Sequence, residues 1–499
     1  MNPLKKLAGQ TVIYGVSTIV GRLLNYLLVP LYTDVFKEGE YGIVTDFYAY
    51  VAFFNVLYLF GLETTFFRLA NKPSADRKLV YNQIQTLVVV NAFVITGLLV
   101  IFASSIVEIL GYPGQEIYIY ILASVMMIDA VVAIPFARLR LEGKAKRFAI
   151  TKIINIVVVI LLNLFFIVWC PILLADGFSG FLLTFYDESV GVGYVFISNL
   201  IANALYLLLL ADLLFKTKPT IATNSLKSVF AYATPIMFLG LAGVTNEMLS
   251  RAMLKYRLPD GYYEGMTSLD ALGVFGACYK LSVFMVLAIQ AFKYAAEPFF
   301  FKGAENKESP ALFAKVMNGF IVFASLLLLA VVANLDFIAG IFLRSDVYLK
   351  ALPTVPWLLL GGLFLGVYYN LSVWFKLTDR TMYGAYISGA GALMTIVLNW
   401  LFIPAYGYMA SAVITSAIYF FMSGASYLIG QKFYTVPYQI GRGLAYIGAI
   451  FGVAMMLYYY HPEDGLMSFM MQNTVVLIVL LLILKIEKVN ISKLIRKRS

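Results

Sequence analysis

Charged residues are scarce in this 499-residue chain, since Lys, Arg, Asp and Glu together make up 13% of it. Soluble globular domains carry about 25% charged residues. Hydrophobic residues account for 61% of the chain, and a soluble protein of that composition could not cover its surface with polar groups. The scarcity of charge therefore excludes a soluble protein and indicates an integral membrane protein with one membrane domain.

Histidine and cysteine are almost missing as well. His461 is the single histidine, and Cys170 and Cys278 are the only cysteines. His461 stands beside a proline in a predicted loop, and the two cysteines lie in or beside apolar segments without CxxC spacing. The sequence therefore offers no histidine-based zinc or triad chemistry and no disulfide framework. We predict that the protein has no metal site and no catalytic residues.

Nucleotide-binding loops and large soluble loops are missing too. Gly-rich stretches such as Gly361-Gly362 lie within apolar segments and do not resemble a phosphate-binding loop. Membrane glycosyltransferases and polysaccharide polymerases usually carry a large soluble loop with acids or histidines, which this sequence does not show. These absences argue against an enzyme and against a resident cofactor. Transport would then use an ion gradient (H⁺ or Na⁺), the membrane potential or a downhill substrate gradient.

Long apolar runs recur along the chain, and each is about as long as a membrane-spanning helix, which needs about 20 residues. They are too long and too continuously apolar for the alternating strands of a membrane β-barrel. The sequence predicts an all-α, polytopic membrane protein with fourteen spans. The first seven are Gln10–Thr33, Tyr41–Leu62, Val80–Ser104, Gln115–Ala137, Ala149–Cys170, Val192–Leu214 and Val229–Met253. The second seven are Leu272–Phe299, Ala311–Leu335, Ala351–Phe375, Met382–Ile403, Gly407–Ile429, Ile440–Tyr460 and Gly465–Leu484.

Positive charge is divided unevenly between the two sides of these spans. Of the 37 Lys and Arg residues, 28 fall in the connections or at the adjoining span ends on one side, six fall likewise on the other side, and three lie deeper inside spans. The positive-inside rule places the basic side in the cytoplasm, with both termini there and an even number of spans. The net charge of +10 then follows from membrane topology, and we exclude nucleic acid as a partner.

The chain also repeats itself weakly. Residues 141–167 read LEGKAKRFAITKIINIVVVILLNLFFI, and residues 377–403 read LTDRTMYGAYISGAGALMTIVLNWLFI. At an offset of 236, Asn163 meets Asn399 near the end of an equivalent helix. Unless this is chance similarity between apolar helices, it predicts a parallel repeat of two six-helix bundles. The predicted divisions are 1–215 for the first bundle, 216–430 for the second, and 431–499 for two further helices with a basic cytoplasmic tail.

Ionisable residues inside a membrane usually face a protein interior or a wet cavity. Arg22 lies near the middle of the first predicted span, on a polar stripe at helical spacing that also includes Asn25. Lipid would not tolerate such a stripe, so we expect both residues to line a cavity between the bundles. The alternative is a structural ion pair between Arg22 and a buried acid.

The seventh and eighth predicted spans carry five more candidates. Lys280, Gln290 and Lys293 lie in the eighth span, where Lys293 and Glu297 are spaced to pair. Glu247 and Arg251 lie in the seventh span, four residues apart, so that they either neutralise each other or face the cavity, unless Arg251 snorkels to the outer surface.

Two acids, Asp46 and Asp129, lie within the second and fourth predicted spans. Each is a candidate partner for Arg22 or a candidate site for a coupling proton or sodium ion. We therefore predict a cationic substrate site of Arg22, Lys280, Arg251 and Lys293. The polar or coupling candidates are Asn25, Asp46, Asp129, Glu247 and Gln290.

Three stretches resemble a known family. The opening QTVIYGVSTIVGRLLNYLLVPLYTDVF and the following EYGIVTDFYAYVAFFNVLYLFGLETTFFR are similar to the start of bacterial polysaccharide exporters. FGACYKLSVFMVLAIQAFKYAAEPFFF, at 275–301, is similar to the eighth helix of that family. These exporters are the Wzx-type flippases of the multidrug/oligosaccharidyl-lipid/polysaccharide exporter (MOP) superfamily. The resemblance covers nearly the whole chain, but its diffuse apolar motifs identify the superfamily better than the substrate.

The resemblance implies two bundles in a V around a central cationic cavity that works by alternating access. It implies a substrate of undecaprenyl-pyrophosphate-linked oligosaccharide, a repeat unit of O-antigen, capsule or exopolysaccharide, moved across the bacterial inner membrane. Arg22 and Lys280 match positions where the family tends to place cavity cations, whereas the surroundings of Arg251 are less typical. The implied partners are membrane lipid and the polysaccharide polymerase and glycosyltransferase machinery. A lipid II flippase for peptidoglycan and a cation-coupled multidrug antiporter are the alternatives.

Overall fold

The computed structural model describes residues 26–72, 75–177, 180, 186–221, 223–303, 309–378, 380–460, 462 and 465–487. Throughout these ranges the secondary structure is helical and contains no strand, which confirms the all-α prediction. The two predicted cavity residues Arg22 and Asn25 lie outside the described residues.

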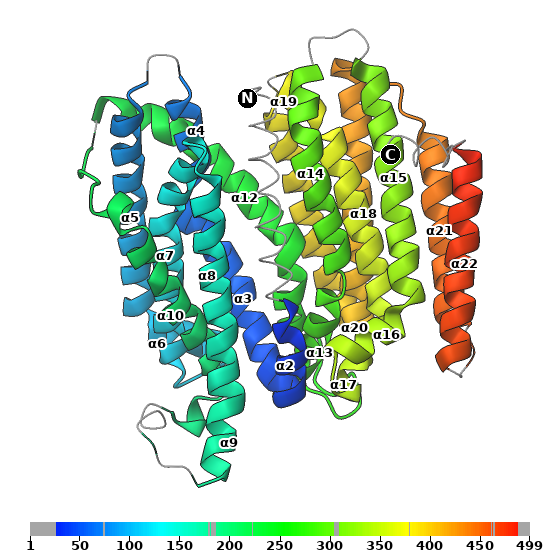
Figure 1. Ribbon diagram of the computed structural model, residues 1–499, viewed down its shortest axis with the longest axis horizontal. Coiled ribbons are helices and arrows are strands. Elements are labelled where there is room, and N and C mark those ends of the chain that lie inside the picture. Colours follow the sequence, from blue (N-terminus) through cyan, green and yellow to red (C-terminus); the bar gives the residue numbers. More distant parts are fainter. Residues whose placement is uncertain are drawn as a thin grey trace.

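The first half of the chain forms the helices on the left of Figure 1, together with α2 and α3 at the centre. They are α2 (Leu28–Val35), α3 (Glu38–Leu59), α4 (Leu62–Ala70), α5 (Arg77–Ile101), α6 (Ala103–Ile109), α7 (Glu116–Leu141), α8 (Ala145–Leu164), the π-helical turn Phe165–Trp169, α9 (Cys170–Ala175), the 3-10 turn Glu188–Val190, α10 (Gly193–Leu209) and α11 (Ala211–Leu214). We call α3–α11 the N-terminal bundle.

The second half begins with α12 (Thr223–Arg257), which runs obliquely from the left group of helices to the right group in Figure 1. It continues with α13 (Ser268–Lys280), α14 (Val283–Gly303), α15 (Ser309–Ala333), α16 (Leu335–Phe342), α17 (Asp346–Leu349), the 3-10 turn Leu352–Thr354, α18 (Val355–Leu371), α19 (Val373–Leu377) and α20 (Met382–Phe433). We call α12–α20 the C-terminal bundle. The last two helices, α21 (Ile440–Tyr459) and α22 (Gly465–Ile486), lie at the right edge.

Ten helices in the described ranges are long and apolar enough to cross a membrane, or eleven when α13 and the start of α14, bent by 45°, count as one span. α20 has 52 residues, about 78 Å at 1.5 Å per residue, which is more than twice the thickness of a bilayer core. Its backbone breaks at Gly407 (φ 56°, ψ −143°), between the two spans predicted there. α10 is one turn short of a full span, and the first predicted span lies mostly outside the described residues. Fourteen spans are compatible with this helix set.

Local sequence sets the ends of several helices. The Asp76 carboxylate accepts hydrogen bonds from the Lys78 and Leu79 amides and caps α5. The C-terminal end of α3 is set by Phe60 and Gly61, which adopt left-handed backbone conformations before α4 begins. A Cβ on Gly61 would lie 2.5 Å from the Ala233 carbonyl oxygen, so the glycine also allows α12 to approach. This turn therefore positions α12 against the N-terminal bundle.

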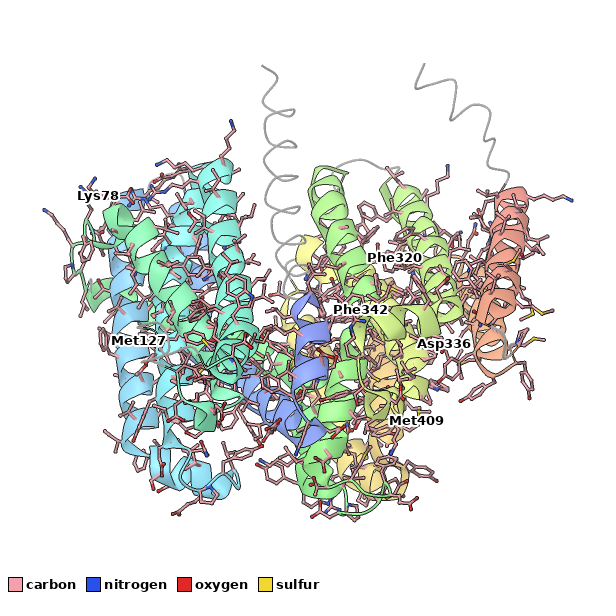
Figure 2. All side chains as sticks on the ribbon, turned by 60° about the horizontal axis from the view of Figure 1, so that its bottom comes forward. Lys78, Met127, Phe320, Asp336, Phe342 and Met409 are labelled. Atoms are coloured by element: carbon pink, nitrogen blue, oxygen red, sulfur yellow. The ribbon has the colours of Figure 1, made fainter. Side chains whose placement is uncertain are left out.

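Alternate connections between successive spans lie at the same end of the molecule. The end that carries the α4–α5, α7–α8 and α14–α15 connections is at the top of Figure 1, and we call it the inner end. Figure 2 shows Lys78 at this end of the N-terminal bundle. The opposite end, with the α12–α13 connection, is the outer end. The cytoplasmic location of the inner end and the domain boundaries at 215 and 430 remain predictions.

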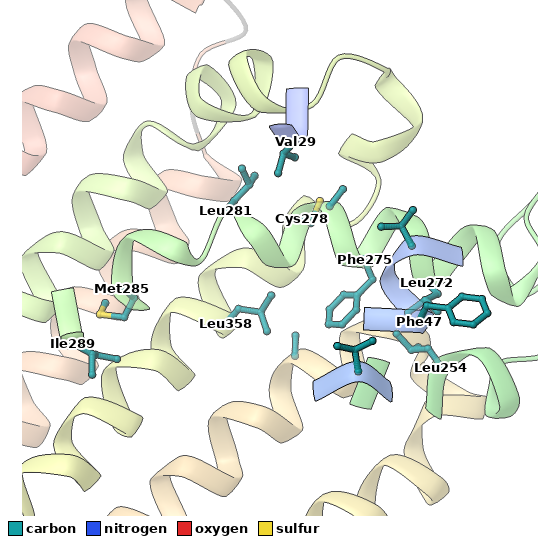
Figure 3. Close-up of a cluster of buried hydrophobic side chains, with 14 of the residues drawn as sticks. Val29, Phe47, Leu254, Leu272, Phe275, Cys278, Leu281, Met285, Ile289 and Leu358 are labelled. Carbon is teal, nitrogen blue, oxygen red and sulfur yellow. The ribbon is translucent and has the colours of Figure 1, made fainter. Parts of the chain in front are cut away.

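The two bundles meet towards the outer end, where α3 packs on α13 and α12, and α2 packs on α13. Phe47 of α3, Leu254 of α12, and Leu272 and Phe275 of α13 are all buried in the same apolar core (Figure 3). The apolar contact holds the two halves together there.

Candidate functional site

A cavity of about 440 Å³ lies within the C-terminal bundle, with walls from α12, α14, α18, α19 and α20, and Val56 of α3 is the one described lining residue from the N-terminal bundle. The polar residues of its lining are Asn246, Glu247, Lys293, Ser372 and Ser388, and the aromatic residues are Tyr368, Tyr369, Phe375 and Tyr419. Charged, amide, hydroxyl and aromatic groups therefore share one wall. Such a wall suits a ligand that combines charge with many hydroxyl groups.

Arg251 lies one helical turn beyond Glu247 on α12, towards the outer end. Its guanidinium carbon stands 3.7 Å from the ring centroid of Tyr279, which indicates a cation–π contact. Tyr419, which lines the cavity, is close enough for the charges of both Glu247 and Arg251 to act on its hydroxyl. Arg251 is therefore packed on aromatic rings beside the cavity and is partly buried.

Lys280 is the last residue of α13, directly before the bend into α14. A cation is favourable there because the final carbonyls of a helix carry partial negative charge. The Lys280 ammonium nitrogen lies 5.7 Å from the ring centroid of Tyr41 on α3, so the side chain faces the opposite bundle. The charge of Arg251 acts on Lys280, and the two cations repel each other.

No carboxylate within the described ranges lies in ion-pair distance of Arg251 or Lys280. The predicted neutralisation of Arg251 by Glu247 is therefore not formed, although the two residues are four apart on one helix. The Arg251 Nε is buried without a hydrogen-bond partner from the described residues. Arg251 and Lys280 are thus two neighbouring cations without an acid in ion-pair distance, and such cations can bind an anionic group.

Lys293 of α14 lines the cavity, with its ammonium nitrogen 4.0 Å from the ring centroid of Tyr369. The side chain of Glu297, its predicted alternative partner, lies outside the described residues. Gln290 lies one turn before Lys293 on α14 and is half-buried. The structure thus places Glu247 and Lys293 in the cavity wall, whereas Arg251 lies on Tyr279 and Lys280 lies towards Tyr41 outside the lining.

Asp129 lies elsewhere, inside the N-terminal bundle. Its carboxylate accepts a hydrogen bond of 3.0 Å from the Asn203 amide, whose oxygen accepts one of 2.9 Å from Asn155. Lys152 of α8 acts on this carboxylate electrostatically and lies over the rings of Phe136 and Tyr206. Asp129 therefore belongs to a polar network between α7, α8 and α10.

Asp46 is not part of the cavity wall either. It is fully buried on α3, and its Oδ2 lies 2.7 Å from the ammonium nitrogen of Lys255 near the end of α12. The Tyr112 hydroxyl donates a second hydrogen bond of 2.9 Å to the same oxygen. The acid that the sequence offered to Arg22 therefore pairs with a cation of the other bundle.

The sequence analysis did not name the cations that act on these acids, Lys152 and Lys255, because both lie near the ends of predicted spans. The structure places them inside α8 and α12. α8 begins four residues before the predicted span Ala149–Cys170, and α12 ends four residues after the predicted span Val229–Met253. The two acids themselves could have indicated these partners, since a carboxylate in the middle of a span requires a nearby hydrogen-bond donor or cation.

Residues 256–401 match the MatE family model, over less than a third of the chain. The fold is similar to that of the lipid II flippase MurJ in an inward closed conformation, with a TM-score of 0.70 and 15% identity over 94% of this chain and 97% of that one. It is also similar to an inward-facing multidrug resistance MATE family transporter of the MOP superfamily, with a TM-score of 0.63 and 14% identity over 87% and 98%.

A third structure is a MOP superfamily transporter from Pyrococcus furiosus, whose binding pocket is described as having reverse polarity. It aligns with a TM-score of 0.57 and 15% identity over 90% of this chain and 99% of that one. A comparison with curated protein sequences finds no match. These likenesses establish that the chain has the fold of MOP superfamily transporters, and together with the MatE segment they support a place in that superfamily.

Proposed function

We propose that the protein is a flippase that moves an undecaprenyl-pyrophosphate-linked oligosaccharide across the bacterial inner membrane by alternating access. The observation that carries the proposal is a group of three cations, with Lys293 in the cavity wall and Arg251 one helical turn from the lining residue Glu247. Arg251 and its neighbour Lys280 have no carboxylate of the described chain in ion-pair distance. A pyrophosphate is multiply anionic and needs cationic partners when it leaves water.

The three cations suit different parts of this task. Arg251 has a planar fork that binds two phosphate oxygens at once, whereas Lys280 and Lys293 supply point charges. The aromatic and hydroxyl groups around Lys293 provide the surface on which a sugar ring stacks and forms hydrogen bonds. Arg22, outside the described residues, is proposed to join them from the first span.

Charge also separates this proposal from the cation-coupled drug antiporter. A site for cationic drugs is expected to be dominated by acids, and the acids inside the described spans are mostly engaged elsewhere. Asp46 is paired with Lys255, and Asp129 belongs to the network of the N-terminal bundle. Among the described residues, Glu247 is the one carboxylate in the cavity lining. The geometry thus favours an anionic ligand, a chemistry that this glycan carrier shares with lipid II.

Transport in proteoliposomes tests the proposal with three substrates. The purified protein is reconstituted with an undecaprenyl-pyrophosphate-linked repeat unit, with lipid II, or with a cationic dye, and movement to the opposite leaflet or compartment is measured. We expect the repeat unit to move, and Arg251→Ala to lower its rate about 10- to 100-fold. Movement of lipid II alone would assign the protein to peptidoglycan synthesis, and accumulation of the dye alone would show an antiporter. Both results contradict the proposal.

A further inference from the structure

The Asp46–Lys255 pair joins the two bundles near the outer end and lies apart from the substrate cavity. Lys255 belongs to α12, whereas Asp46 belongs to α3. The Lys255 ammonium also donates to the Leu110 carbonyl oxygen in the α6–α7 connection and lies 3.7 Å from the ring centroid of Tyr112. One lysine of the C-terminal bundle is thus held by three groups of the N-terminal bundle.

The surrounding contact between the bundles is closely packed. A Cβ on Gly273 of α13 would lie 2.0 Å from the Glu38 carbonyl oxygen of α3, and a Cβ on Gly42 would lie 2.3 Å from the Leu269 carbonyl oxygen. Because the helix backbones touch, the bundles cannot part gradually at this point. Separation of α12 from α3 at this end would therefore break the Lys255 contacts with Asp46, Leu110 and Tyr112.

Opening would leave Asp46 without its cation. The side chain is fully buried, and an isolated buried carboxylate is strongly unfavourable. Its Oδ2 keeps the hydrogen bond from Tyr112, which belongs to the same bundle and stays with it. Its Oδ1 is buried and has no hydrogen-bond partner among the described residues. A vacant carboxylate oxygen is therefore already in place for another cation.

We propose that Asp46 is a monovalent-cation site at the outer end, which Lys255 occupies when that end is closed and which a proton or a sodium ion from the outer solution occupies when it is open. The site deepens the proposed function, because outward opening is one half of alternating access. The net charge of the site stays constant during this exchange. The cation enters from the outer water as Lys255 leaves, and it returns to that water when Lys255 comes back.

The other ionisable groups around the carboxylate do not replace the cation. Tyr50 of α3 and Tyr256 of α12 share a hydrogen bond of 2.9 Å between their hydroxyls, and Tyr112 already donates to Oδ2. These phenols are neutral near pH 7 and donate hydrogen bonds without neutralising charge. Lys255 is the one cation in ion-pair distance of Asp46 within the described chain.

Cysteine labelling of the full-length protein in right-side-out vesicles tests the site without any substrate. Thr45, buried against Gly276 in the α3–α13 contact, is changed to Cys after Cys170 and Cys278 are replaced by alanine. A membrane-impermeant maleimide then reports outer opening. Labelling of an exposed cysteine, Glu188→Cys, corrects for the effect of pH on the thiol.

We expect corrected labelling of the Thr45→Cys protein to rise at least threefold when the outer pH falls from 7.5 to 5.5, if the ion is a proton. If the ion is sodium, labelling rises at constant pH when sodium replaces choline. Asp46→Asn should raise labelling and remove both dependences. The matched control is Asp212→Asn, which removes an exposed pair with Arg147 inside the N-terminal bundle and should keep the dependence.

The double variant Asp46→Asn/Lys255→Gln removes both charges and leaves no unpaired lysine. It therefore provides the test if the single variant misfolds. Well-folded protein with labelling independent of proton and sodium supports the site. The proposal is overturned if either variant keeps the ion dependence, or if neither ion changes labelling of the parent protein. If labelling depends on the ion but the protein moves no glycan lipid, the proposed substrate is wrong, whereas the cation site at Asp46 is still supported.

Discussion

Asn163 of α8 and Asn399 of α20 make the same hydrogen bonds in the two halves of the chain. Each amide donates to the carbonyl oxygen four residues earlier, at 2.8 Å in both cases. Each side-chain oxygen accepts from a hydroxyl, that of Tyr32 at 2.8 Å and that of Ser411 at 3.1 Å. Both asparagines are fully buried. The two asparagines lie at the predicted offset of 236, but Tyr32 belongs to the first predicted span and Ser411 to the twelfth, so the repeat of two bundles stays a prediction.

These two asparagines should therefore have matching effects on stability. Asn163→Ala and Asn399→Ala each leave a hydroxyl without its acceptor, which costs about 1–3 kcal/mol for a buried group. We expect similar losses of thermal stability for the two variants in detergent, with Asn473→Ala, on a more exposed face of α22, having less effect. A large loss for one variant and none for the other would show that the two positions are not equivalent.

Removal of a cavity cation should impair transport more than folding. A hydrogen bond to a charged group contributes about 1.5–3 kcal/mol, so Arg251→Ala should lower flipping of the glycan lipid about 10- to 100-fold. Arg251→Lys should recover part of the rate because it keeps the charge and loses the fork. Initial flipping rates in proteoliposomes and melting temperatures are measured together. Normal flipping by well-folded Arg251→Ala protein would remove Arg251 from the site.

Asp129 tests whether the network in the N-terminal bundle couples transport to ions. We expect Asp129→Asn to weaken the dependence of flipping on a proton or sodium gradient, because Asp46 remains, while basal exchange persists. The control is Asp129→Asn/Lys152→Gln, which removes the opposing charge as well. If the single variant unfolds and the double variant is stable and still coupled, the pair is structural, with a cost of about 3–5 kcal/mol for the stranded cation.

Glycine at position 273 should be essential to closing the outer end. Gly273→Ala places a methyl group 2.0 Å from the Glu38 carbonyl oxygen, so the two helices must move apart. We expect lower thermal stability and higher outer labelling of Thr45→Cys. Gly448→Ala in α21 is the matched control, because a Cβ there meets nothing within 4 Å. Unchanged labelling in Gly273→Ala would show that this helix crossing does not close the outer end.

Topology is tested by cysteines on the two ends of the molecule. A cysteine at Gly143, in the α7–α8 connection, should be protected from an impermeant reagent in intact cells. One at Glu188, in the connection before α10, should react. Reaction at position 143 from outside would reverse the predicted orientation, with both termini then outside.

Composition and periodicity determined the helical membrane fold. Low charge and apolar runs of spanning length leave the helix as the structure that satisfies every backbone hydrogen bond in lipid. The cations Lys280 and Arg251 were also identified from sequence, because a charge inside an apolar run is conspicuous. The break within α20 was predicted too, since Gly407 begins a new span after Pro404.

Tertiary structure alone decided which charges pair. Asp46 and Lys255 are 209 positions apart, and no spacing rule connects residues on helices of different bundles. In the same way, Glu247 and Arg251 have the spacing of a pair and are not paired, because the Tyr279 ring holds the guanidinium. Hydropathy depends on each residue and its neighbours along the chain, whereas an ion pair in a membrane depends on which helices pack together. For this protein, the sequence by itself determined the helices, and helix packing decided which charges are paired and which are left for a substrate.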